Sequence, residues 1–143
     1  MRNSIWSAAA ILVGRFVFAA VFIMAVTFKL IDIGATAQMI AAAGFPMANV
    51  LAWLAVLFEL GLIACFLTGA YFSEASLLAA AYVVFLGFAF HGPSRWAANQ
   101  AEFGFFVDHF TFMAGLLFAA AHGPGRILAI RTRGLLSDHD QNA

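Results

Sequence analysis

An uninterrupted apolar run from Val50 to Thr68 restricts the folds open to this chain more than any other stretch. The hydrocarbon core of a bilayer is about 30 Å thick, and about 20 helical residues cross it. The run therefore predicts a transmembrane helix. Glu59 lies near its centre. Because an ionisable group at that depth is costly, we expect its carboxylate to face protein or water and to have a partner.

Three further apolar segments have a similar length and character. Together with the first they predict four membrane spans, at about residues 5–31, 49–69, 74–91 and 103–122. Between the first two spans, residues 35–43 are rich in alanine and predict a short helix at the membrane interface. We therefore expect an all-α membrane protein, a four-transmembrane-helix bundle that forms one integral membrane domain over residues 1–143, with residues 123–143 as a cytoplasmic tail.

The composition agrees with this fold class and narrows the function. Of the 143 residues, 64% are hydrophobic and 10% are charged, whereas soluble domains carry about 25% charged residues. The net charge is zero and no basic patch is present, which argues against a nucleic-acid partner. Cys65 is the single cysteine, so no intramolecular disulfide, CxxC pair or thiolate metal cage is possible. No flavin or nucleotide motif is visible.

Basic residues are distributed unevenly between the two sides of the predicted membrane protein. Four spans place both termini on one side, which Arg2, Arg126, Arg131 and Arg133 flank. Lys29 and Arg95 flank the other side. Cytoplasmic loops carry an excess of Lys and Arg, so the bias predicts that both termini lie in the cytoplasm. The setting that this predicts is a bacterial-type inner membrane.

Two ionisable residues are expected at mid-membrane depth. Arg15 lies about ten residues into the first span, and Glu59 lies at a comparable depth in the second. We therefore predict an Arg15–Glu59 pair. Such a pair either fixes the packing of two helices or handles a proton or ligand.

A second group of ionisable residues gathers near the outer ends of the spans. Helix ends and loops bring together Lys29, Asp32, His91, Arg95, Glu102, Asp108 and His109. On the fourth helix Asp108 shares a stripe with Gly104, Thr111 and Gly115, which predicts an interior position for Asp108. The cluster is a candidate site for a quinone or another small molecule, or a hydrated loop region. The histidines lack the spacing of metal ligands, so no metal site is predicted.

Several short motifs, in order, resemble the DoxX family. They are Gly14-Arg15, Phe28-Lys29-Leu30, Gly44-Phe45-Pro46, Glu59-Leu60 and Gly123-Pro124-Gly125-Arg126. The resemblance implies a four-helix membrane bundle. It also implies association with oxidoreductases, since members are membrane subunits of thiosulfate:quinone oxidoreductase or membrane partners of thiol-redox and superoxide-detoxifying enzymes. The fourth span departs from the family, because Phe106-Val107-Asp108-His109 stands where a Phe-Leu-Lys-Asn-like sequence is common.

These observations leave several functions open. The first hypothesis is a non-catalytic membrane subunit of a redox complex, which anchors or assembles its partners and contributes to a quinone site. A purely structural accessory subunit is a weaker form of the same hypothesis. The alternative is a small transporter or channel that uses the Arg15–Glu59 pair and assembles from several copies.

Overall fold

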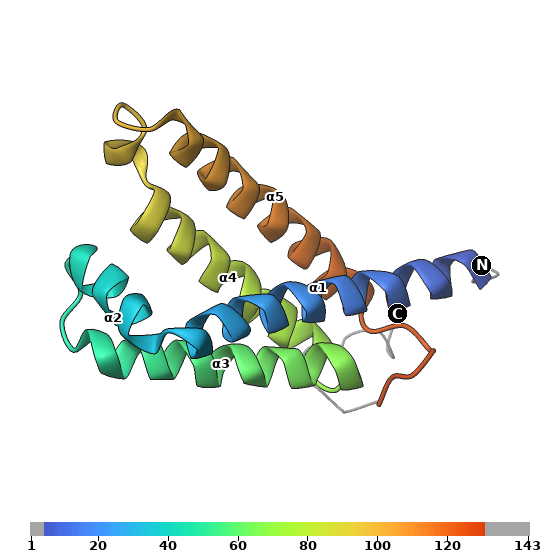
Figure 1. Cartoon of the computed structure of the whole chain (residues 1–143). Helices are drawn as coiled ribbons and strands as arrows, with labels where there is room; N and C mark the ends of the chain where they lie inside the picture. The colour runs from blue at the N-terminus through green and yellow to red at the C-terminus, as the bar shows by residue number, and fades with distance from the viewer. Residues whose placement is uncertain (1–4, 131–143) are drawn as a thin grey trace. The chain divides into compact units, whose positions relative to one another are not determined.

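The computed structural model describes residues 5–130 and divides them into two compact units (Figure 1). The first unit contains residues 5–70 together with the segment 124–130, and the second contains residues 71–123. Each unit is described by itself below. The prediction of a single domain over the whole chain stays a prediction, and most of the predicted cytoplasmic tail, residues 131–143, lies outside the described residues.

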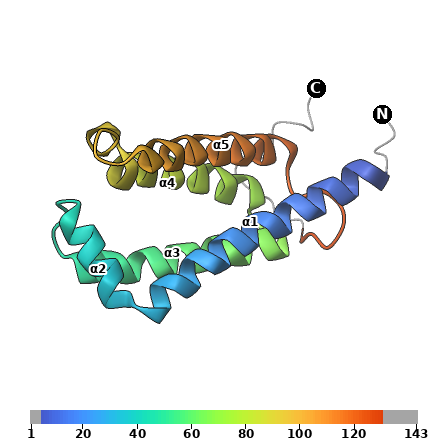
Figure 2. The same ribbon diagram turned by 45° about the horizontal axis from the view of Figure 1, so that its top comes forward.

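The first unit is built from α1 (Ile5–Ile31), α2 (Ile33–Ala42) and α3 (Ala48–Thr68). Helices α1 and α3 lie side by side, and α2 follows α1 after a break and packs against α3 (Figures 1 and 2). Asp32 forms the break, because its Oδ1 accepts a hydrogen bond from the Ala35 amide and so caps α2. The core is apolar and consists of Ala19, Phe22, Val26, Ala37, Ile40, Ala52, Val56, Leu62, Ile63 and Phe66.

Helix α1 is longer than one span requires. Its 27 residues extend over about 40 Å, whereas the 21 residues of α3 extend over about 31 Å. The amino-terminal end of α1 continues beyond the carboxyl end of α3 (Figures 1 and 2). Arg15 consequently lies beside the last turn of α3. The expectation that Arg15 and Glu59 lie at a comparable level is wrong, because residue count along α1 alone ignores how far α1 extends past the end of α3.

The second unit is a helical hairpin of α4 (Phe72–His91) and α5 (Gln100–His122), joined by a short 3-10 turn, η1 (Pro93–Arg95). Pro93 at the start of η1 cannot continue α4, so the helix ends at His91 as the sequence predicts. Helix α5 begins three residues earlier than expected, because the Asn99 side chain accepts a hydrogen bond from the Ala101 amide. The two helices pack along their length.

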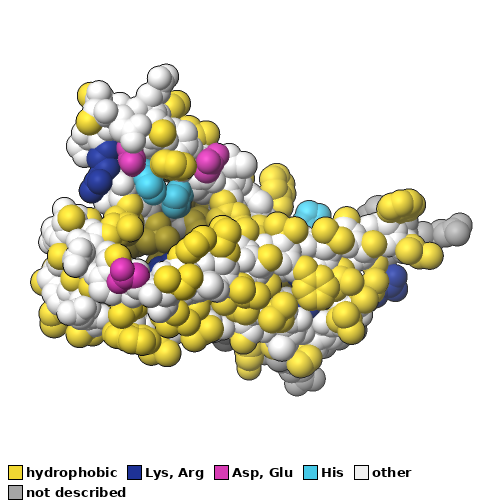
Figure 3. Space-filling view, in the orientation of Figure 1, with side chains coloured by type: hydrophobic (Ala, Val, Ile, Leu, Met, Phe, Trp, Pro, Cys, Tyr) yellow, Lys and Arg dark blue, Asp and Glu magenta, His cyan; other side chains and the backbone are white. Residues whose placement is uncertain are grey.

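The structure confirms the predicted fold class. Four helices of the described chain are long and apolar enough to cross a membrane, and a shorter helix lies between the first two. Hydrophobic side chains cover most of the visible helical surface (Figure 3). Large exposed apolar residues occur along all four long helices, including Met24, Leu57, Phe85 and Phe118. This surface is what contact with lipid requires, since the bilayer core offers nothing to polar groups.

Candidate functional site

Arg15 is a buried cation whose hydrogen-bonding capacity is fully used. It is 1% exposed. A guanidinium carries five N–H donors, and all five reach backbone carbonyls at 2.9–3.1 Å. The acceptors are the carbonyl oxygens of Phe66, Leu67, Pro124, Ile127 and Leu128. Arg15 therefore ties the end of α3 to the segment 124–130, which we call the strap.

The strap completes the carboxyl end of α3. The last four carbonyls of a helix have no partner within it. The Cys65 carbonyl accepts from the Gly69 amide at 2.8 Å, and the Thr68 carbonyl accepts from the Ile130 amide at 2.9 Å. Arg15 supplies donors to the two carbonyls between them. Because α3 has no basic residue in its last turn, Arg15 also provides the cation that the negative end of the helix dipole favours.

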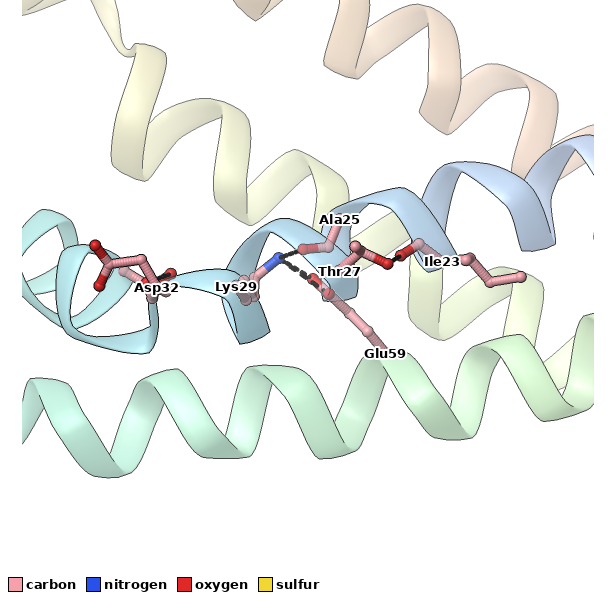
Figure 4. A network of polar contacts seen from close by, with 7 residues as sticks. Ile23, Ala25, Thr27, Lys29, Asp32 and Glu59 are labelled. Carbon is pink, nitrogen blue, oxygen red and sulfur yellow. Dashed lines mark hydrogen bonds and ion pairs between the residues drawn. The ribbon is translucent and has the colours of Figure 1, made fainter.

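Glu59 pairs with Lys29, so the predicted Arg15–Glu59 pair is wrong. Lys29 Nζ lies 2.9 Å from Glu59 Oε1 and 3.0 Å from Oε2, and it also donates to the Ala25 carbonyl at 3.4 Å (Figure 4). The Glu59 side chain is 1% exposed and that of Lys29 is 19% exposed. The physical reason is the stagger of α1 past α3, which brings Lys29 rather than Arg15 within reach of the carboxylate.

The burial of both predicted residues is confirmed, but their roles differ from those expected. Arg15 stabilises a helix end and a strap, and Glu59 neutralises a cation near the break between α1 and α2. A transport path through an Arg15–Glu59 pair loses its structural basis, since the two side chains have separate partners.

The second unit contains an imidazole–carboxylate dyad at the end where α4 meets η1. His91 Nδ1 lies 2.7 Å from Glu102 Oε2, and the two side chains are 27% and 20% exposed. A carboxylate accepts hydrogen bonds, so Nδ1 of His91 carries the proton and donates it. The Trp96 indole donates to the His91 carbonyl at 2.9 Å, which fixes the loop beside the dyad. His91 Nε2 has no hydrogen-bond partner among residues 5–130.

His109 lies directly beside this dyad. Its ring centroid is 5.2 Å from that of His91, and its Nδ1 lies 2.7 Å from the Phe105 carbonyl one turn earlier in α5. The backbone of Gly87 on α4 makes room for the ring, because a Cβ at that position would lie 3.1 Å from the Cβ of His109. His109 thus faces the neighbouring helix of its own chain, one of the two positions that the sequence leaves open.

Aromatic rings surround the two histidines. Phe105 lies 5.3 Å from His91, and Trp96 makes edge contacts with Phe103 at 5.0 Å and Phe106 at 5.2 Å. In the space-filling view the histidines gather next to an acidic side chain at this end of the hairpin (Figure 3). The arrangement combines a hydrogen-bonding imidazole with flat apolar surfaces, which suits a planar ligand that carries carbonyl oxygens.

The remaining members of the predicted outer cluster take separate positions. Asp32 caps α2 and Lys29 binds Glu59, both in the first unit. Arg95 is exposed in η1. Asp108 is exposed on α5, so its predicted interior position is wrong; the residues of α5 that face α4 are others, including His109 and Phe110.

Sequence reasoning did not assign two of these features. Lys29 as the partner of Glu59 follows only when the stagger of α1 and α3 is known. Glu102, the partner of His91, is 11 residues away across a turn. Helical spacing therefore does not predict the contact between the two residues. The role of Arg15 does have a signal in the sequence, because α3 has no basic residue in its last turn. The last carbonyls of such a helix need hydrogen-bond donors from another part of the chain.

One of three comparisons with known proteins found a match. No curated protein and no solved structure matches the chain. The model of the DoxX family matches residues 10–92. These residues include Arg15, Lys29, Glu59 and His91, whereas Glu102, Asp108 and His109 follow the matched region. A match over more than half of the chain, with four helices that can span a bilayer, identifies this integral membrane protein as a member of the DoxX family.

Proposed function

We propose that the protein is a membrane subunit of a quinone-linked redox complex, in which it anchors or assembles the complex and forms part of a quinone site. The observation that carries the proposal is the His91–Glu102 dyad with His109 and aromatic rings beside it. Membership of the DoxX family supports it, because the resemblance to that family implies association with oxidoreductases.

The dyad can exchange hydrogen bonds with a quinone or its quinol. A quinone supplies a flat ring and two carbonyl oxygens, and it accepts electrons and protons from its surroundings. Glu102 accepts the Nδ1 proton of His91 at 2.7 Å, which leaves Nε2 to face the ligand. As a neutral imidazole, Nε2 accepts a hydrogen bond from a quinol hydroxyl, and as an imidazolium it donates one to a quinone carbonyl oxygen. Phe105 and His109 offer ring faces or edges at 5.3 and 5.2 Å from His91. Electrons come from a cofactor-bearing partner subunit.

The proposal includes a bacterial-type inner membrane and an orientation with both termini in the cytoplasm. The sequence places Lys29 among the outer charges, but in the structure Glu59 pairs with Lys29 inside the first unit. Among the described residues, Arg95 is then the cation left in an outer loop, while Arg126 follows α5 on the side of the termini. This change strengthens the asymmetry that determines orientation.

Trp96 provides a direct test of quinone binding. Its indole bonds the backbone of His91 at 2.9 Å, so a bound quinone is expected to quench its fluorescence. A variant with Trp6→Phe and Trp53→Phe, purified in nanodiscs, isolates that signal for titration with decylubiquinone. His91→Gln should weaken binding roughly fivefold, since a lost hydrogen bond costs about 1 kcal/mol.

His122→Gln is the matched control. His122 lies on α5, the helix of His109, and its Nδ1 is 2.8 Å from the Phe118 carbonyl, just as His109 Nδ1 is 2.7 Å from the Phe105 carbonyl. Quenching should be unchanged in this variant. Equal affinity in the His91 and His122 variants, or no saturable quenching at all, would remove the quinone site and leave an accessory subunit with a purely structural role.

A further inference from the structure

The side of α5 that points away from α4 carries a carboxylate without a partner. Asp108 is exposed, and no hydrogen bond or ion pair reaches it from the residues that the structure describes. Ala101, Gly104 and Thr111 are exposed as well. At about 100° per residue these four positions lie within about 80° of one another around the helix. We call them the Asp108 face.

This face lies opposite the contact with α4. Phe106 and Phe110 are each two residues from Asp108, about 200° around the helix. Both make edge contacts with Phe88 of α4, at 5.1 and 5.9 Å. A Cβ built at Gly104 would meet nothing within 4 Å. Leu116 is the one buried residue of α5, whereas α4 has seven.

Asp108 lies within a helix that is long and apolar enough to cross a membrane, away from both ends of that helix. It is eight residues from the start of the helix and 14 from its end, or about 12 and 21 Å. The side chain of aspartate is too short to reach the interface from there, unlike that of Lys or Arg. A carboxylate inside a span is rare and pairs with another group. The small residues beside it permit close approach of a second helix.

Among the described residues, the two cations inside the long helices already have partners, and Arg95 and Arg126 lie outside those helices. Arg15 uses all five of its donors on carbonyls. Lys29 uses its three on Glu59 and Ala25. A second copy docked on the same face by a two-fold axis would set two Asp108 carboxylates against each other, which is unfavourable in a low dielectric. The complement that fits is a cation on a different protein.

From this we infer that the Asp108 face binds a transmembrane helix of another subunit, and that this helix carries a Lys or Arg at the depth of Asp108. The inference rests on the proposed function in one respect, because it takes the partner to be a subunit of the same redox complex. The ion pair would select the partner and fix its register, and Ala101 and Gly104 would set the distance between the helices.

Photo-crosslinking in native membranes tests this inference. The photoreactive amino acid p-benzoylphenylalanine is placed at Thr111, or at Ala101 if the first variant fails to assemble. The control position is Leu117, which is exposed and about 180° around the helix from Asp108. We expect a product from the Asp108 face whose cross-linked peptide is a membrane span with a Lys or Arg, and much less product from position 117.

Charge exchange then identifies the interaction. Asp108→Asn should lower the yield about threefold to twentyfold, the range that hydrogen bonds between membrane helices support, and Asp108→Glu should retain most of it. Asp108→Lys should abolish the product, and an Asp in place of the partner's cation should restore it. Restoration separates a specific ion pair from a general loss of folding.

Three outcomes would overturn the inference: a cross-link to residues 5–70 of the same chain, a cross-link to a second copy, or a product with lipid alone. A partner span without a cation, or a yield that Asp108→Asn does not change, would do so too. These failures are distinct from failure of the proposed function, because quenching of Trp96 reports the quinone site separately. Quenching that depends on His91 without a cross-link removes only the partner helix.

Discussion

Arg15 and Lys29 lie fourteen residues apart on α1, and the protein stabilises the two cations by different means. Arg15 is surrounded by five carbonyl oxygens, whereas Lys29 has a carboxylate. The planar guanidinium with its fixed donors suits several backbone acceptors at once, and the ammonium suits one bidentate anion. Neither residue can replace the other without leaving buried polar groups unpaired.

Replacing only one member of the Lys29–Glu59 pair should destabilise the protein more than replacing both. Glu59→Leu leaves the Lys29 ammonium without a counter-charge, which costs about 3–5 kcal/mol for a buried pair. The double variant Lys29→Met with Glu59→Leu should recover most of that loss, because two apolar side chains can pack where the pair was. Thermal unfolding in detergent measures both. A double variant as unstable as the single one would contradict this account.

Arg15→Lys should release the strap. Lysine has three donors in place of five, so at least two of the carbonyls are left without a partner, each at a cost of about 1–3 kcal/mol. The amide of Ile130, which bonds the Thr68 carbonyl at 2.9 Å, should exchange its hydrogen faster. Arg126→Lys is the control, since Arg126 is exposed. Equal protection of Ile130 in both variants would show that Arg15 does not hold the strap.

At the level of elements, the join between α3 and the strap depends on Gly69. Its φ of 76° lies in the left-handed region, which side chains disfavour. A Cβ there would also lie 3.0 Å from that of Ala129 and 3.2 Å from Arg15 Nη2. The residue therefore ends α3 and lets the strap approach closely. Both demands are met only when the side chain is a hydrogen.

Gly69→Ala should lower stability by about 1–3 kcal/mol, the cost of a left-handed conformation in a residue other than glycine. Gly61→Ala is the matched control within α3. A Cβ at that position meets nothing within 4 Å, and alanine in a helix is favoured by about 0.5–1 kcal/mol. Melting temperatures in detergent compare the two. A Gly69 variant that melts like the Gly61 variant would rule out the role given to this turn.

The elements themselves could be predicted from the sequence, and their pairing could not. Apolar length defines four spans, and Gly92-Pro93 defines the end of α4. The stagger of α1 past α3 leaves no trace in hydropathy, so the sequence predicts the wrong partner for Glu59. Hydropathy also does not show which face of α5 meets α4. The small residues beside Asp108 predict an interior position, but small residues also occur where a helix of a different protein docks.

For the whole molecule, the candidate site could be predicted in part. Its histidines are conspicuous in an apolar chain, but the dyad requires the turn at η1, which the Trp96 indole fixes through the His91 carbonyl. Bonds of this kind depend on tertiary geometry. The family relation is visible in short motifs, and the matched residues 10–92 end just before the loop to α5.

Orientation in the membrane is a prediction for the whole molecule. With Cys65→Ala as background, a cysteine at Ser94 should react with a membrane-impermeant maleimide added outside intact cells. A cysteine at Arg126 should react only after the membrane is permeabilised. This follows from both termini being cytoplasmic. The reverse pattern of labelling would show that the cations near the termini do not determine the topology.

Native mass spectrometry of the tagged chain, extracted gently from its own membranes, shows whether the protein is a subunit of a redox complex. We expect an assembly in which this chain is joined at fixed stoichiometry by at least one cofactor-bearing redox subunit. We also expect a quinone-sized mass whose intensity falls in the His91→Gln variant. A chain recovered alone, or only with copies of itself, would contradict the claim that it is a subunit of a redox complex.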